Sequence, residues 1–183
     1  KIICLTAMCA VLVMSGCGES ATPEKKFDGS KGEVTLLTLD PGHFHAALVQ
    51  MYMYDQVSPE VYVYAPEGDD IKMHLDRIKI YNEREENPTQ WNENLYTGED
   101  YLEKMLQEKK GNVVVLAGNN GKKTSYVKAA VDAGINVLSD KPMAIDAERF
   151  AMLEKTLDEA AAKGVMVYDI MTERSEINNE LQR

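Results

Sequence analysis

The sequence predicts an α/β domain built on a doubly wound parallel sheet. Segments typical of strands alternate with segments typical of helices from residue 33 to residue 170, which is the pattern of a sheet with helices on both faces. The run Val113–Ala117 is apolar throughout, as strands buried on both faces are. Glycine or proline follows several of these segments, where the chain must turn. The 183 residues suffice for one domain with its own core.

The first residues have the pattern of an exported lipoprotein. Residues 1–16 combine a basic start, an apolar core and small residues at the end, as a secretory signal peptide does. The stretch Met14–Cys17 resembles a bacterial lipobox, so we expect cleavage before Cys17 and lipidation of its thiol. A plain signal peptide or a buried first helix is the alternative. We expect polar residues 17–32 to be a tether, and the protein to be anchored in the bacterial cell envelope, on the periplasmic or outer-membrane face.

The period of the apolar residues divides the rest of the chain into strands and helices. The expected strands are 33–40, 59–68, 112–121, 135–142 and 165–170. The expected helices are 43–54, 69–85, 99–110, 122–134 and 146–164. We expect 87–98 to be a loop, and residues 171–183 to begin another helix that leads into a further domain.

Net charge limits the class of ligand. The formal charge of −10 argues against binding of a nucleic-acid backbone through a basic surface. A small anionic ligand remains compatible, because backbone N–H groups can hold one locally. In a doubly wound sheet such ligands bind beyond the carboxyl ends of the strands, so the polar residues at those ends are the candidates for a site.

The turn after the first strand has three readings. On the spacing of the glycine fingerprint that cradles a pyrophosphate, Asp40 takes the first glycine position, Gly42 the second and His45 the third. The second glycine matters most for close approach of the backbone, and it is present. The segment is therefore an altered phosphate turn, a metal site on His43 and His45, or an ordinary strand-to-helix turn. We expect no metal, because residues two apart on a helix point to different faces and no third ligand is evident.

Two further strand ends carry polar side chains. Asn119 and Asn120 follow the apolar strand, where their amides could bind a ribose or a carboxamide; asparagine also favours turns for its own sake. Lys122 and Lys123 are expected at the solvated start of a helix. At the next strand end, Lys141 stands between a carboxylate and a proline, where it could orient or polarise a substrate hydroxyl or form a surface ion pair.

The segment around Lys141 resembles a known family. "AAVDAGINVLSDKPMAID" resembles the Glu-Lys-Pro segment of the glucose-fructose oxidoreductase, inositol dehydrogenase and rhizopine-catabolism (Gfo/Idh/MocA) family. Asp140 stands in place of its glutamate, and the residues that fall in step are Ala130, Gly134, Val137, Lys141, Pro142 and Ala144. "VVVLAGNN" resembles the preceding strand end of that family. The similarity is strongest between residues 112 and 145.

The resemblance implies a Rossmann-like domain that binds NAD or NADP, here 33–171, with 172–183 starting the connection to an α+β domain that we expect to be missing from this chain. It implies that Lys141 is catalytic, near the nicotinamide and a substrate hydroxyl, and that a catalytic histidine comes from the second domain. The implied partner is a small carbohydrate or polyol, and a homo-oligomer is left open for the full-length form. The candidate cofactor-binding residues are Asp40, Gly42, His43, His45, Asn119, Asn120, Asp140, Lys141 and Pro142.

Three functions follow, because the sequence departs from the family at the glycine fingerprint and carries an export signal. The first is an exported oxidoreductase acting on a sugar or polyol. The second is a glycoside hydrolase that retains its NAD, as some relatives do. The third is a non-enzymatic carbohydrate-binding lipoprotein whose cofactor site has degenerated. The second strand end shows no clear acidic residue for a ribose, although Glu67, Asp69 or Asp70 could serve.

Overall fold

The computed structural model describes residues 27–171 and 177–181. The predicted signal peptide, Cys17 and most of the predicted tether lie outside these residues. The last residues of that predicted tether lie against the domain, since the N–H of Gly32 donates a hydrogen bond to the carbonyl oxygen of Asp55 at 2.8 Å. Within the part of the chain that is described, no helix has the length and apolar character needed to cross a membrane.

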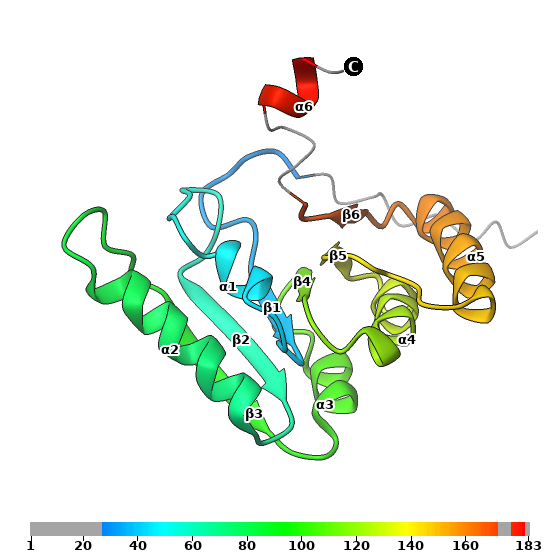
Figure 1. Ribbon diagram of the computed structural model, residues 1–183, viewed down its shortest axis with the longest axis horizontal. Coiled ribbons are helices and arrows are strands. Elements are labelled where there is room, and N and C mark those ends of the chain that lie inside the picture. Colours follow the sequence, from blue (N-terminus) through cyan, green and yellow to red (C-terminus); the bar gives the residue numbers. More distant parts are fainter. Residues whose placement is uncertain (1–26, 172–176, 182–183) are drawn as a thin grey trace, which may run out of the picture.

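Six parallel strands form one sheet, in the order β3-β2-β1-β4-β5-β6 (Figure 1). The strands are β1 (Leu36–Leu39), β2 (Glu60–Ala65), β3 (Asn92–Thr97), β4 (Val113–Leu116), β5 (Asn136–Ser139) and β6 (Val167–Asp169). The chain winds outward from β1 to β3, returns to place β4 beside β1, and then winds the other way. The predicted doubly wound parallel sheet is confirmed, with the switch point between β1 and β4.

The helices are α1 (His45–Leu48), α2 (Asp69–Glu83), α3 (Tyr101–Glu108), α4 (Asn120–Asp132), α5 (Ala147–Lys163) and α6 (Ile177–Leu181). Those from α1 to α5 cover the two faces of this sheet (Figure 1). Side chains from α1 and α2 pack in one core cluster, whereas side chains from α3, α4 and α5 pack in a second. The sheet therefore separates two cores, as its alternating side chains require.

The central strands explain why this sheet is stable. Val114 and Leu116 of β4 face the core under α4, while Val113 and Val115 face the core under α1 and α2. All four residues of β4 are buried. Burial of one such side chain contributes about 1.5–3 kcal/mol relative to its exposure, so an uninterrupted apolar run suits this position.

The segment predicted as a loop, 87–98, contains a strand, so that prediction is wrong. β3 pairs with β2 over six residues, from Asn92 opposite Glu60 to Thr97 opposite Ala65. The sequence lacks the usual alternation of apolar residues here, because β3 is at the edge of the sheet and several of its side chains are exposed and polar. Edge strands commonly carry such residues, which discourage pairing with another chain.

The helix predicted over 43–54 is also wrong in its extent, because α1 is a single turn. Downstream of α1, backbone carbonyl groups bind side chains from other elements. The indole N–H of Trp91 donates to the carbonyl oxygen of Gln50 at 2.6 Å, and Arg84 donates to that of Met51 at 2.6 Å. These bonds hold the segment against β3 and the end of α2, so tertiary contacts override the local preference for helix.

Candidate functional site

Three strand ends meet at one edge of the sheet. β1, β4 and β5 are neighbours in the order of the sheet, and they run parallel. Their carboxyl ends therefore bring together the turns that begin with Asp40, Gly118 and Asp140. Every residue predicted for the site, from Asp40 to Pro142, belongs to one of these turns or to a helix that opens from it. Whether they bind a cofactor stays a prediction.

Asp40 holds the turn after β1 to α4. Its backbone has a positive φ of 47°, which aspartate tolerates better than most residues. Its Oδ2 accepts hydrogen bonds from Nδ2 of Asn119 and from the hydroxyl of Tyr126, each at 2.7 Å. Phe44 is the residue at the N-cap of α1, and it provides no side-chain cap. Asp40 is therefore a connector between β1 and α4, and it does not cap α1.

Gly42 and Gly118 bring the turns after β1 and β4 into backbone contact. A Cβ on Gly118 would lie 2.4–2.8 Å from backbone atoms of Gly42. The N–H groups of Gly42 and His43 donate to the carbonyl oxygen of Ala117, at 2.9 and 3.1 Å. These two N–H groups are satisfied within the protein, so this turn differs from a standard phosphate cradle.

A buried ion pair lies beneath the end of β5. Nζ of Lys123 contacts Oδ1 of Asp140, and the two residues are 1% and 3% exposed. The same ammonium donates to Oδ1 of Asn120 at 2.8 Å. The sequence-based prediction that Lys123 is solvated is wrong. Lys123 precedes buried Val127 and Ala130 by four and seven residues, and this spacing on one helix face was the signal that could have revealed its burial.

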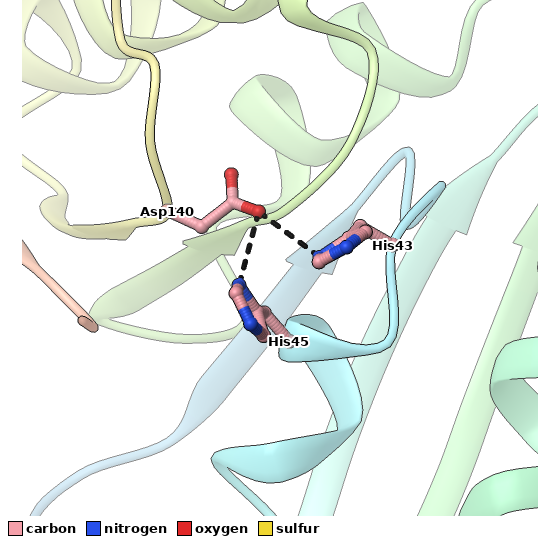
Figure 2. A group of neighbouring side chains, drawn as sticks. All are labelled: His43, His45 and Asp140. Carbon is pink, nitrogen blue, oxygen red and sulfur yellow. Dashed lines mark ion pairs between the residues drawn. The ribbon is translucent and has the colours of Figure 1, made fainter. Parts of the chain in front are cut away.

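Two imidazoles lie against the other oxygen of the same carboxylate (Figure 2). Nδ1 of His43 is 3.3 Å, and Nδ1 of His45 3.4 Å, from Oδ2 of Asp140. Desolvation, followed by the charge of His45, lowers the pKa of His43. His43 precedes α1 rather than lying within it, so the two side chains converge. The expectation that they point apart, with no third ligand, is therefore wrong, although the expected absence of a metal remains untested.

Lys141 occupies an exposed position beside this cluster. It follows Asp140 directly, and the Lys141–Pro142 peptide bond is cis. Its side chain is exposed, while its positive charge contributes to the lowered pKa of His43. The ammonium group is thus available to a ligand at the edge of the sheet.

A small cavity at the end of β2 completes the edge. It has a volume of about 180 Å³ and is bordered by Asp40, Pro41 and the segment from Ala65 to Ile71. Glu67, Asp69 and Asp70 line it, and such carboxylates can accept hydrogen bonds from ribose hydroxyls. The cavity lies at the same edge of the sheet as the exposed backbone of Gly42 and the exposed side chain of Lys141. A Cβ on Gly42 would make only ordinary contacts of 3.5 Å or more with the surrounding protein.

Comparison with known proteins identifies the family. Residues 67–169 match the model of the GFO_IDH_MocA oxidoreductase family, described as having an NAD-binding Rossmann fold. The chain belongs to the Gfo/Idh/MocA family. The match begins after the turn at Gly42 and includes the ends of β4 and β5. The segment with the altered fingerprint is thus outside the matched residues.

Solved structures agree with this family assignment. A protein from Parabacteroides merdae that is described as an oxidoreductase is 64% identical, with a TM-score of 0.83 over 85% of this chain and 36% of that chain. This chain spans only about a third of that protein's length. No curated protein matches the chain.

More distant solved structures share the fold. The WlbA dehydrogenase from Chromobacterium violaceum, solved with NADH and UDP-GlcNAcA, is 17% identical, with a TM-score of 0.58 over 82% of this chain and 38% of that chain. The myo-inositol 2-dehydrogenase from Lactobacillus plantarum is 14% identical, with a TM-score of 0.54 over 78% and 38%. At these identities the similarity concerns the fold alone.

Proposed function

We propose that this chain is the cofactor-binding part of an exported oxidoreductase that acts on a hydroxyl group of a sugar or polyol, with NAD or NADP. The observation that carries the proposal is the exposed Lys141 at the end of β5, next to the switch point of a Gfo/Idh/MocA domain. Export and a lipid anchor at Cys17 are supported by the pattern of the first residues.

Residues at the edge of the sheet would have separate roles in binding the cofactor and orienting the substrate. Glu67, Asp69 and Asp70 would bind the ribose near β2, and Gly42 would let the dinucleotide approach the backbone. Lys141 would donate a hydrogen bond to the substrate hydroxyl and hold the reacting carbon in place. A bound nicotinamide ring would supply the hydride acceptor.

Lys123 and Asp140 support this arrangement from below. The buried ammonium of Lys123 compensates the charge of Asp140 at the base of the turn that carries Lys141. A fixed turn loses less entropy when a ligand binds. These two are therefore positioning residues, whereas Lys141 is the catalytic candidate. The resemblance leaves the acceptor of the hydroxyl proton to the second domain.

The first experiment asks whether the full-length protein carries a nicotinamide dinucleotide. We would denature the purified protein and examine the released small molecules by mass spectrometry, then measure binding of added NAD and NADP. Bound dinucleotide is expected. A protein that neither carries nor binds either dinucleotide, but binds carbohydrate, would overturn the proposal in favour of a binding lipoprotein.

Gly42→Ala tests the placement of the dinucleotide. The fold has room for this methyl group, whereas a ligand in contact with the glycine backbone has none, so we expect weaker dinucleotide binding with unchanged stability. Gly121→Ala on α4 is the control, because its Cβ would meet only Oδ1 of Asn119 at 3.9 Å. Unchanged binding in Gly42→Ala would show that the dinucleotide does not cross this turn.

Lys141→Met tests the catalytic role. We expect kcat on an oxidisable sugar or polyol to fall by about 100-fold or more, because a positioned polar group typically contributes this much. Lys155→Met, on the exposed side of α5, should leave kcat unchanged. Equal rates in both variants would remove Lys141 from the mechanism. Net glycoside cleavage without accumulating reduced cofactor would instead indicate the NAD-retaining hydrolase.

A further inference from the structure

The cluster of His43, His45 and Asp140 has a geometry that the proposed hydride transfer does not use. One ring nitrogen of each histidine and one carboxylate oxygen lie within 4.8 Å of one another. Figure 2 shows both rings, from the segment after β1, pointing at the same oxygen of the residue after β5. Three potential ligand atoms thus come from two separate turns and converge on one small volume.

Both nitrogen-to-oxygen spacings in this cluster match those between metal ligands. Zinc binds histidine nitrogen and carboxylate oxygen at about 2.0–2.2 Å in a tetrahedron, which puts neighbouring ligand atoms about 3.3 Å apart. The observed nitrogen-to-oxygen distances are 3.3 and 3.4 Å. We propose that His43, His45 and Asp140 bind one divalent transition-metal ion of the zinc class.

The Nδ1 atom of His45, which has no hydrogen-bond partner among the described residues, supports the same site. This nitrogen is buried, and Oδ2 of Asp140 is close. A buried polar atom without a partner costs about 1–3 kcal/mol. Coordination of a metal would satisfy this nitrogen, whereas the surrounding protein does not.

Lys123 orients the carboxylate for this role and also limits the affinity. Its ammonium holds Oδ1 of Asp140 and leaves Oδ2 facing the imidazoles, as partners behind metal ligands commonly do. The positive charges of Lys123 and of nearby Lys141 oppose a divalent cation. We therefore infer a site of lower affinity than a closed structural zinc site with four protein ligands.

The site has an open position, because only three protein ligands converge. Two imidazoles and one carboxylate with open positions are typical of catalytic metal centres. A hydroxyl or carbonyl oxygen of a ligand at the edge of the sheet could occupy that position. The proposed metal site does not require the proposed dinucleotide, since all three ligands belong to this chain.

Metal titration of the full-length protein tests the site without any measurement of activity. The protein is treated with a chelator, freed of dinucleotide, and titrated with Zn²⁺ by calorimetry and with Co²⁺ by absorption. We expect one ion per chain, and Co²⁺ absorption bands typical of a low-coordinate site with nitrogen ligands. Absence of stoichiometric binding would overturn the proposal.

Histidine variants decide which residues bind the ion. His43→Ala and His45→Ala should each weaken Zn²⁺ binding by at least about 100-fold, because loss of a direct ligand exceeds the 10–100-fold typical of outer partners. Asp158→Asn, an exposed change on α5, should leave binding unchanged. Asp140→Asn leaves the buried Lys123 without a charged partner. The folding of this variant must therefore be checked first, and the histidine variants decide the question.

The outcomes separate the metal site from the proposed function. Zn²⁺ binding that is equal in all variants would show adventitious surface binding and overturn the site. If the histidine substitutions weaken Zn²⁺ binding but the protein binds no dinucleotide, the metal site is supported and the proposed oxidoreductase function is contradicted. If the protein binds a dinucleotide but the histidine substitutions leave Zn²⁺ binding unchanged, the oxidoreductase function is supported and the metal site is contradicted.

Discussion

The two halves of the sheet hold their buried ionisable groups in different ways. In the half formed by β4, β5 and β6, Lys123 and Asp140 are buried as a pair. In the half formed by β1, β2 and β3, both ring nitrogens of His74 and Oε2 of Glu93 are buried without a hydrogen-bond partner among the described residues. Burial lowers the pKa of His74 to about 4 and raises that of Glu93 to about 7.

This difference separates a positioning device from a source of pH dependence. A buried pair keeps its charges when each partner compensates the other, and so holds a turn in place. Unpaired buried groups become neutral instead, and their protonation then changes stability with pH. The candidate site is built against the paired group, because Asp140 contacts Lys123 through one carboxylate oxygen and lies against His43 and His45 with the other.

The largest expected effect comes from breaking the pair. Lys123→Met leaves the carboxylate of Asp140 buried without its ammonium partner, which typically costs about 3–5 kcal/mol. Urea denaturation should show this loss in the free energy of unfolding. Lys122→Met is the matched control, because Lys122 is exposed and donates to the hydroxyl of Tyr101 at 3.0 Å. Equal losses in the two variants would contradict the contrast between paired and solvated lysines.

The next effect concerns the contact that joins the halves at the switch point. Gly118→Ala places a Cβ 2.4 Å from the backbone nitrogen of Gly42 at a φ of 113°. We expect a loss of about 3 kcal/mol, because both steric overlap and backbone strain must be relieved. Gly121→Ala, in the first turn of α4, should instead be neutral or stabilise by up to about 1 kcal/mol. A small effect at Gly118 would mean that the turns are not in contact.

Glu93 makes the other half sensitive to pH. Its folded-state pKa, about 7, lies above the ordinary value of 4.5, so its contribution to stability is present below pH 4.5 and is lost as the pH rises through about 7. The change is on the order of 3 kcal/mol, at about 1.4 kcal/mol per pKa unit. His74 contributes in the opposite direction, because its lowered pKa makes stability rise with pH over nearly the same range. The free energy of unfolding of the wild type relative to that of Glu93→Gln should therefore fall across this range, whereas relative to that of Glu103→Gln, an exposed change on α3, it should stay constant. A constant difference between the wild type and Glu93→Gln would show that Glu93 is not the source.

The sequence predicted the parts of the fold whose signal is local. The apolar run of β4 predicted a buried strand, and the segment "SDKP" at the end of β5 predicted a candidate site. β3 escaped because a solvated edge strand needs no apolar alternation. The convergence of His43 and His45 escaped because it depends on where α1 begins, and helix boundaries are set by tertiary contacts. The helical spacing of Lys123 to Val127 and Ala130 carried a local signal of its burial, but its partner Asp140 is 17 residues away and had no local signal.

Tyr126 offers the smallest and sharpest test, since it links the two halves through one hydroxyl. That hydroxyl donates to Oδ2 of Asp40 and shares a hydrogen bond with the hydroxyl of Tyr101, and burial raises its pKa. Tyr126→Phe should cost about 1–2 kcal/mol, because Asp40 loses a hydrogen bond to its charge. Tyr168→Phe on β6, 60% exposed, should change the free energy of unfolding by less than about 0.5 kcal/mol. If the two variants unfold alike, Asp40 is held by Asn119 alone, and the turn after β1 depends less on α4 than its geometry indicates.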